Sequence, residues 1–154
     1  MMETRRIFLV RSAGLVALAG GVLAGGRSQA TPQAMAALIA EIAAGREIKK
    51  GKGTLDLPPL IDNGNAVPMT VTVDSPMSER DYVKTIHVVN EKNPQPHVIV
   101  CHLGPRSGRA AFSTRIKLAD AQTVTAIAEM SDGTLWMDSA SVIVTLAACL
   151  EDIL

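Results

Sequence analysis

The sequence predicts an all-β sandwich with one short helix in front of it, and three observations support that prediction. Apolar residues alternate with polar ones over several runs, which is typical of strands with one buried face. Strong turn signals separate those runs at short intervals. A single helical stripe of apolar residues precedes the alternating part of the chain.

The alternating runs begin at Thr54 and continue almost to the end of the chain. Turn signals such as Asp62-Asn63-Gly64 and Ser131-Asp132-Gly133 lie between them. Short strands separated in this way are typical of an immunoglobulin-like β-sandwich with Greek-key connections, and a small barrel is the alternative. We predict about seven strands, over residues 54–57, 66–73, 83–90, 97–103, 110–118, 122–130 and 135–147.

The helical stripe lies in the segment 31–53. Thr31-Pro32 has the pattern of an N-cap followed by proline at the first helical position, and Gly45 is a stop signal. We predict a short amphipathic helix over 33–44, followed by a polar linker to residue 53. The helix should dock on the domain or on a partner through four residues at helical spacing, Met35, Leu38, Ile39 and Ile42.

Residues 1–30 have the pattern of an export signal. Arg5-Arg6 precedes a short apolar run over 13–24, and Ser28-Gln29-Ala30 provides small residues for cleavage. This order is typical of a secretory signal peptide, and the arginine pair favours the twin-arginine route. A membrane anchor is the less favoured alternative, because spanning a bilayer needs about 20 apolar residues. We expect a periplasmic protein with no membrane attachment in its mature form.

The charge balance argues against nucleic acid as a partner. The chain has 15 basic and 15 acidic side chains, and cleavage after Ala30 would remove four arginines and one glutamate. The remaining domain is therefore mildly acidic, and its longest basic stretch is Lys49-Lys50-Gly51-Lys52. Nucleic-acid binding normally requires a basic patch or stripe.

The histidines do not form a recognisable catalytic or metal-binding motif. His87 is expected at a surface or sheet edge. Cys101 and His102 are adjacent in a predicted strand and should point to opposite faces, whereas His97 and Cys101 should share a face about 13 Å apart. No serine lies in a nucleophile-elbow motif. We therefore predict no catalytic residue, no cofactor and no metal site.

The two cysteines have different predicted environments. Cys101 should lie within a strand, on the same face as Ile99 and Leu103, as a buried thiol. Cys149 lies two residues beyond the last predicted strand, and only five residues come after it. A disulfide between the two remains open, because an exported protein permits one.

Several segments of the chain form a recognisable set: Leu57-Pro58, Asp62-Asn63-Gly64-Asn65-Ala66-Val67-Pro68, Val73-Asp74-Ser75-Pro76-Met77, Tyr82-Val83-Lys84-Thr85-Ile86-His87, Asn93-Pro94-Gln95-Pro96, Ser113-Thr114-Arg115-Ile116-Lys117-Leu118-Ala119-Asp120 and Ala128-Glu129-Met130-Ser131-Asp132-Gly133-Thr134-Leu135-Trp136-Met137. Together they resemble the SoxY family, the sulfur-carrier subunits of the bacterial thiosulfate-oxidising system. The resemblance runs from about Thr54 to Cys149. It implies an immunoglobulin-like periplasmic domain paired with a SoxZ-like β-sandwich subunit. It also implies covalent attachment of sulfur at Cys149, on which partner enzymes act, so that the carrier itself is no catalyst.

The C-terminus departs from the Gly-Gly-Cys-Gly-Gly ending of that family. Ala147-Ala148 and Leu150 flank Cys149, and alanine restricts the backbone more than glycine does. The acidic pair Glu151-Asp152 disfavours the thiolate. Two hypotheses follow for the sandwich 54–149 and its tail 150–154. The first is a sulfur carrier on Cys149, and the second is a non-carrier interaction module with Cys149 buried or disulfide-bonded. A thiol-dependent enzyme is a weaker third reading, because no residue is placed to activate the sulfur.

Overall fold

The computed structural model describes residues 31–146. The predicted export signal, Cys149 and the tail 150–154 lie outside the described residues. The elements are α2 (Pro32–Ala43), β1 (Ile48–Lys50), β2 (Gly53–Asp56), β3 (Leu60–Asn63), β4 (Val67–Val73), β5 (Val83–Asn90), β6 (His97–His102), a 3₁₀ turn (Pro105–Ser107), β7 (Ala111–Ile116), β8 (Gln122–Met130) and β9 (Leu135–Leu146).

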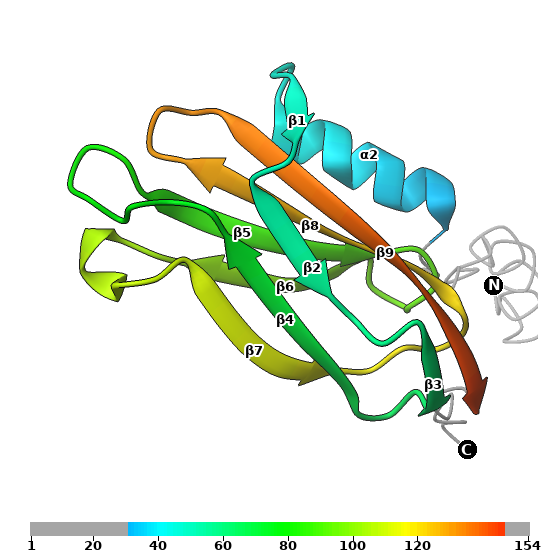
Figure 1. Cartoon of the computed structure of the whole chain (residues 1–154). Coiled ribbons are helices and arrows are strands. Elements are labelled where there is room, and N and C mark those ends of the chain that lie inside the picture. The colour runs from blue at the N-terminus through cyan, green and yellow to red at the C-terminus, as the bar shows by residue number, and fades with distance from the viewer. Residues whose placement is uncertain (1–30, 147–154) are drawn as a thin grey trace, which may run out of the picture.

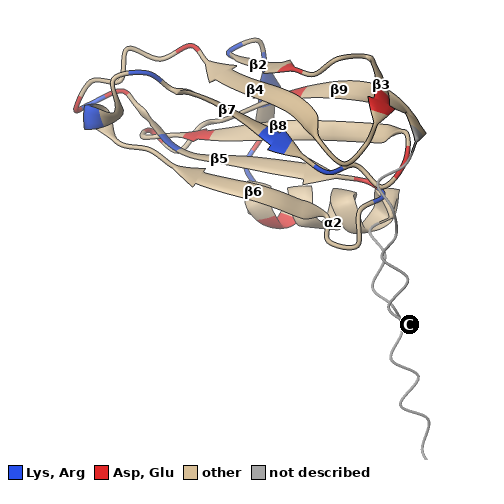
Figure 2. Ribbon diagram, turned by 90° about the horizontal axis from the view of Figure 1, so that it is seen from below, with Lys and Arg blue, Asp and Glu red and all other residues tan. Residues whose placement is uncertain are grey.

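The strands form two facing sheets, which confirms the predicted sandwich (Figure 1). The larger sheet has the order β1-β9-β8-β5-β6, and β3 also pairs with β9. The smaller sheet has the order β2-β4-β7. Seen from below, the small sheet, the large sheet and α2 form three successive layers, and charged residues are scattered over them (Figure 2).

All seven predicted strands are present, and β1 and β3 are two further strands that the sequence did not predict. β1 lies within the predicted linker, so the expectation of a linker is wrong over Ile48–Lys50. Both extra strands run parallel to β9: Ile48 pairs with Leu135 at its start, and Leu60 pairs with Ile143 near its end. Runs of three or four residues are too short to show a period of two.

The helix α2 has the predicted boundaries to within one residue. The Thr31 hydroxyl accepts a hydrogen bond from the Ala34 amide at 3.0 Å, which caps the helix, and Pro32 is the first helical residue. Ala44 ends it in the left-handed conformation, with φ of 48°, and Gly45 follows with φ of 79°. Within residues 31–146 there is no helix long and apolar enough to cross a membrane.

The main core lies between the two sheets, and we call it the inner core. Strand β4 shows its origin, because its odd-numbered residues are buried whereas Pro68, Thr70 and Thr72 are not. The inner faces of β5 and β8 supply the matching apolar layer. Its fully buried members include Val67, Met69, Val71, Val83, Ile86, Val88, Leu118, Val124 and Met130.

A second, smaller core lies between α2 and the opposite face of the large sheet, and we call it the outer core. Ala43 of the helix, Ile127 of β8 and Leu135 of β9 are its buried members. Ile39 and Ile42, from the predicted stripe, pack against them with Ile48 and Met137. The helix therefore docks on its own domain.

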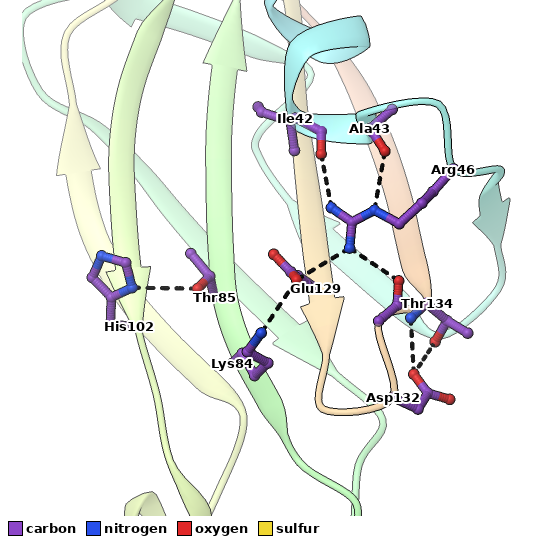
Figure 3. Close-up of polar contacts among 10 residues, drawn as sticks. Ile42, Ala43, Arg46, Lys84, Thr85, His102, Glu129, Asp132 and Thr134 are labelled. Carbon is purple, nitrogen blue, oxygen red and sulfur yellow. Dashed lines mark hydrogen bonds and ion pairs between the residues drawn. The ribbon is translucent and has the colours of Figure 1, made fainter.

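Arg46 fastens the end of α2 to the large sheet (Figure 3). Its guanidinium donates hydrogen bonds to the Ile42 and Ala43 carbonyls, both at 3.0 Å, and to the Gly133 carbonyl at 3.1 Å. It also pairs with Glu129 at 3.1 Å, and Lys84 approaches the same carboxylate at 3.4 Å. Burial alone would raise the pKa of Glu129, but the hydrogen bonds from Arg46 and Lys84 outweigh it and lower the pKa.

Candidate functional site

The predicted attachment residue lies outside the described residues, so the site is bounded by the strand that leads to it. β9 is a twelve-residue strand that ends at Leu146, at the end of the sandwich that also holds β3 (Figure 1). We call this the exit end. Cys149 is three residues further along the chain, so its Cα lies at most about 11 Å from that of Leu146.

Strand β3 holds β9 in the sheet as far as its last residue. Asn63 of β3 pairs with Leu146, and the Thr145 hydroxyl donates to the carbonyl oxygens of Ile61 at 3.5 Å and Asp62 at 3.3 Å. The chain therefore leaves the domain from a fixed point. Sequence reasoning missed this support, because β3 is recognised only from its pairing with β9.

Two large apolar side chains are exposed at the exit end. Leu60 on β3 is 57% exposed and Ile143 on β9 is 60% exposed, and the two residues are register partners. Both lie on the opposite face from Ile61 and Val142, which contact the inner core. Adjacent exposed apolar residues of this size favour contact with another protein segment.

Cys101, in contrast, belongs to the inner face of β6. Its thiol is free and half-buried, and it packs against the inner core together with Ile99 and Leu103. The predicted face is confirmed. The side chain is less deeply buried than expected because β6 is the last strand of the large sheet.

The register of the large sheet excludes a disulfide between the two cysteines of one chain. Cys101 lies in one row with Ile86, Ala128 and Trp136. Leu146 is ten residues beyond Trp136 on the same strand, which is about 33 Å along a β-strand. The three residues from Leu146 to Cys149 can shorten that separation by at most about 11 Å. A disulfide needs the two Cα atoms to lie within about 7 Å of each other. The bridged form of the alternative hypothesis therefore fails for a pairing with Cys101.

The three histidines gather on the outer face of β5 and β6. His87 Nδ1 and His97 Nε2 lie 3.3 Å apart. Figure 3 shows the third histidine, His102, whose Nδ1 lies 3.3 Å from the Thr85 hydroxyl. Burial lowers the pKa of His87, and repulsion from His97 and His102 lowers it further against the attraction of Glu129. In the described part of the chain, no three His, Cys, Asp or Glu side chains converge to hold a metal ion.

One expectation about these residues is wrong. His97 and Cys101 do not share a face, because the pairing of β5 with β6 shifts its register between Val88 and Val89. The shift places His97 opposite Val89 and beside His87, whereas Cys101 faces the inner core. A bulge of this kind re-aims a side chain and leaves no mark in an isolated strand sequence.

The other end of the sandwich carries a basic, open cavity of ≈360 Å³. Lys52 and Arg109 line it, near the start of β2 and before β7. The ammonium groups of Lys49 and Lys52 also lie 5.9 and 5.2 Å from the centroid of the Trp136 ring. The row of Trp136 is about 33 Å from Leu146 along the strand. Cys149, only three residues beyond Leu146, therefore cannot reach this cavity in its own chain.

Comparison with known proteins identifies the family to which this fold belongs. Residues 39–149 match the model of the family described as sulfur oxidation protein SoxY. The chain belongs to the SoxY family. Membership identifies it as a sulfur oxidation protein. No curated protein sequence matches the chain.

Solved structures support the same fold. The sulfur carrier protein SoxY from Chlorobium limicola f thiosulfatophilum superposes with a TM-score of 0.57 at 20% identity, over 71% of this chain and 93% of that one. A putative superoxide reductase from Thermotoga maritima gives 0.54 at 20% identity, over 63% and 93%. A superoxide reductase (neelaredoxin) from Ignicoccus hospitalis gives 0.55 at 15% identity, over 77% and 97%. At these identities the likeness is one of fold alone.

Proposed function

We propose that this protein is a periplasmic carrier that holds thiosulfate-derived sulfur covalently on Cys149 and presents it to partner enzymes. The observation that carries the proposal is the course of β9, which β3 holds in the sheet up to Leu146. The SoxY match, which extends to residue 149, supports the same reading. A thiol three residues beyond the end of a strand has a short reach, of at most about 11 Å between Cα atoms.

The attachment chemistry requires a partner. Joining the Cys149 sulfur to the terminal sulfur of thiosulfate forms an S–S bond and releases the thiol proton and two electrons. In this proposal the two-electron acceptor belongs to the enzyme that loads the carrier. The thiolate is the attacking species, and the neighbouring acidic residues lower its population. Without that electron acceptor the adduct should not form.

The proposal includes a SoxZ-like β-sandwich subunit as a stable partner, with other periplasmic sulfur-oxidising enzymes binding transiently. The exposed pair Leu60 and Ile143 supports a protein contact close to the exit end. Twin-arginine export of the folded carrier, with removal of residues 1–30, belongs to the same proposal and rests on the sequence pattern.

The alternative is a non-carrier interaction module in which the tail covers Cys149. One observation favours it: the tail carries Leu150, Ile153 and Leu154, and the exposed Leu60 and Ile143 lie where β9 ends. The apolar residues of the tail and the exposed pair Leu60 and Ile143 could bury each other and shield the Cys149 thiol.

Intact-mass measurement tests the carrier proposal. The protein is incubated with thiosulfate and the partner oxidising enzymes, beside the variants Cys149→Ala and Cys101→Ala. We expect a sulfur adduct on the unaltered protein and on Cys101→Ala, and none on Cys149→Ala. An adduct that persists in Cys149→Ala contradicts the proposal. So does the absence of any adduct together with a Cys149 thiol that resists alkylation in the native protein, which is the result expected for the module.

A further inference from the structure

The outer face of the β5–β6 pair holds an arrangement of histidines that sulfur carriage does not use. His87 Nδ1 and His97 Nε2 are 3.3 Å apart and form a hydrogen bond, in which the donor is set by the tautomers of the two rings. The ring centroids are 5.4 Å apart, with 32° between the ring planes. The centroids are farther apart than the two nitrogens, so each nitrogen lies on the ring edge that faces the other ring.

The distance between the two nitrogens matches one geometry of metal ligation. Two imidazole nitrogens at Zn–N distances of 2.0–2.1 Å on a tetrahedral ion are separated by about 3.3 Å. Adjacent nitrogens on a square-planar ion are separated by about 2.9 Å. The observed 3.3 Å therefore fits a tetrahedral ion better than a square-planar one.

The backbone fixes this spacing. The two histidines lie on neighbouring antiparallel strands, and the register shift at Val88/Val89 places His97 opposite Val89, on the same sheet face as His87. Val88 and Val89 are fully buried, so the strand that carries His87 cannot shift without disturbing packed residues. Both histidines are only half-buried, so a metal ion bound between them would have its remaining coordination positions facing solvent.

We propose that His87 Nδ1 and His97 Nε2 form a two-histidine binding site for Zn²⁺, with water completing the tetrahedron. Each neutral ring then carries its proton on its other nitrogen, His87 on Nε2 and His97 on Nδ1, so binding requires only a change of tautomer. The site is independent of Cys149. Leu146 is seven residues beyond Ser139, the β9 residue in the row of His97, which is about 23 Å along a strand. The remaining three residues reach at most about 11 Å.

Calorimetric titration with ZnCl₂ tests the site. All proteins carry Cys149→Ala, because a thiolate in the tail is itself a zinc ligand, and this background also separates the test from the carrier proposal. The variants are His87→Gln and His97→Gln, with His102→Gln as the matched control from the same sheet face. We expect one saturable equivalent in the background protein, weakened at least about tenfold in either of the first two variants and within about twofold in the control.

A second readout separates ligation from loss of structure. In NMR spectra, Zn²⁺ should shift the ring signals of His87 and His97 and leave those of His102 in place. Circular dichroism checks that each variant is folded, and either His87→Gln or His97→Gln suffices if the other is not. The proposal is overturned if binding does not saturate by about 1 mM Zn²⁺. It is equally overturned if both variants bind like the background, or if the control loses affinity to the same extent.

Discussion

The two faces of the large sheet differ in what they bury. The inner face packs against the small sheet and forms a continuous apolar layer that extends along β5, β8 and β9. The outer face is divided: α2 covers the part that carries Ile127 and Leu135, whereas the β5–β6 part carries the three histidines. The inner face therefore determines whether the sandwich folds. Changes to the helix attachment and the polar groups of the outer face should cost less of the free energy of unfolding.

The largest effect should come from the inner face. Ile86→Ala removes a fully buried side chain that faces the small sheet, and the surrounding strands cannot close the cavity. We expect a loss of about 3–4 kcal/mol in the free energy of unfolding, measured by urea denaturation. A loss below 1 kcal/mol would mean that this layer is not closely packed.

Leu135→Ala tests the outer face with a side chain that is also fully buried. Its neighbours Ile39, Ile42, Ile48 and Met137 are only partly buried, so they can move into the space. We expect a loss of about 2–3 kcal/mol. The decisive measurement is hydrogen exchange, in which α2 should lose protection while β4 and β5 keep theirs. Equal loss in all three elements would mean that the two cores are one cooperative unit.

Arg46→Met tests the polar attachment of α2. It removes the contacts to Ile42, Ala43, Gly133 and Glu129 from a side chain that is 36% exposed. We expect a loss of about 1–2 kcal/mol, reduced from the buried case by solvent screening. Lys84→Met is the matched control: it approaches the same carboxylate at 3.4 Å, is 47% exposed, and should cost less than about 0.5 kcal/mol.

Arg46→Met should also change how the free energy of unfolding depends on pH in the acid range. The pKa of Glu129 is lowered in the folded protein, so its contribution is complete above its ordinary pKa and is lost as pH falls through the folded value. Without Arg46 the folded pKa should rise towards the ordinary value. Urea midpoints measured across the acid range should then show a smaller loss on acidification for Arg46→Met than for the unaltered protein. An unchanged pH dependence in this range would mean that Lys84 alone sets the pKa.

The smallest expected effect concerns His87. Its pKa is lowered in the folded state, so the unfolded chain binds the proton more readily than the folded one. Stability should therefore decrease as pH falls from about 6.5 towards the folded value, by less than about 1 kcal/mol because the ring is partly exposed. His87→Gln should flatten that part of the pH profile. A profile that keeps its slope in the variant would assign the effect to another group.

The alternating pattern was sufficient to predict the sandwich, because each of its seven principal strands has one face in the inner core. It could not reveal β1 and β3, which are stabilised by pairing with β9 and contribute little apolar periodicity of their own. The histidine pair also escaped prediction. It depends on which strands are neighbours and on a one-residue irregularity at Val88/Val89, and neither is written in the sequence of a single strand. The role of Cys149 stays a prediction, supported by the family to which the chain belongs.

The attachment of β9 at its end has a mechanical consequence. Strand β8 pairs with β9 as far as Val142, and β3 pairs with the residues that follow, from Ile143 to Leu146, with hydrogen bonds across the strand axis. A pull on the C-terminus along that axis would load many of these bonds in shear at once, instead of opening them one after another. A partner enzyme could therefore pull on the C-terminus without unfolding the domain.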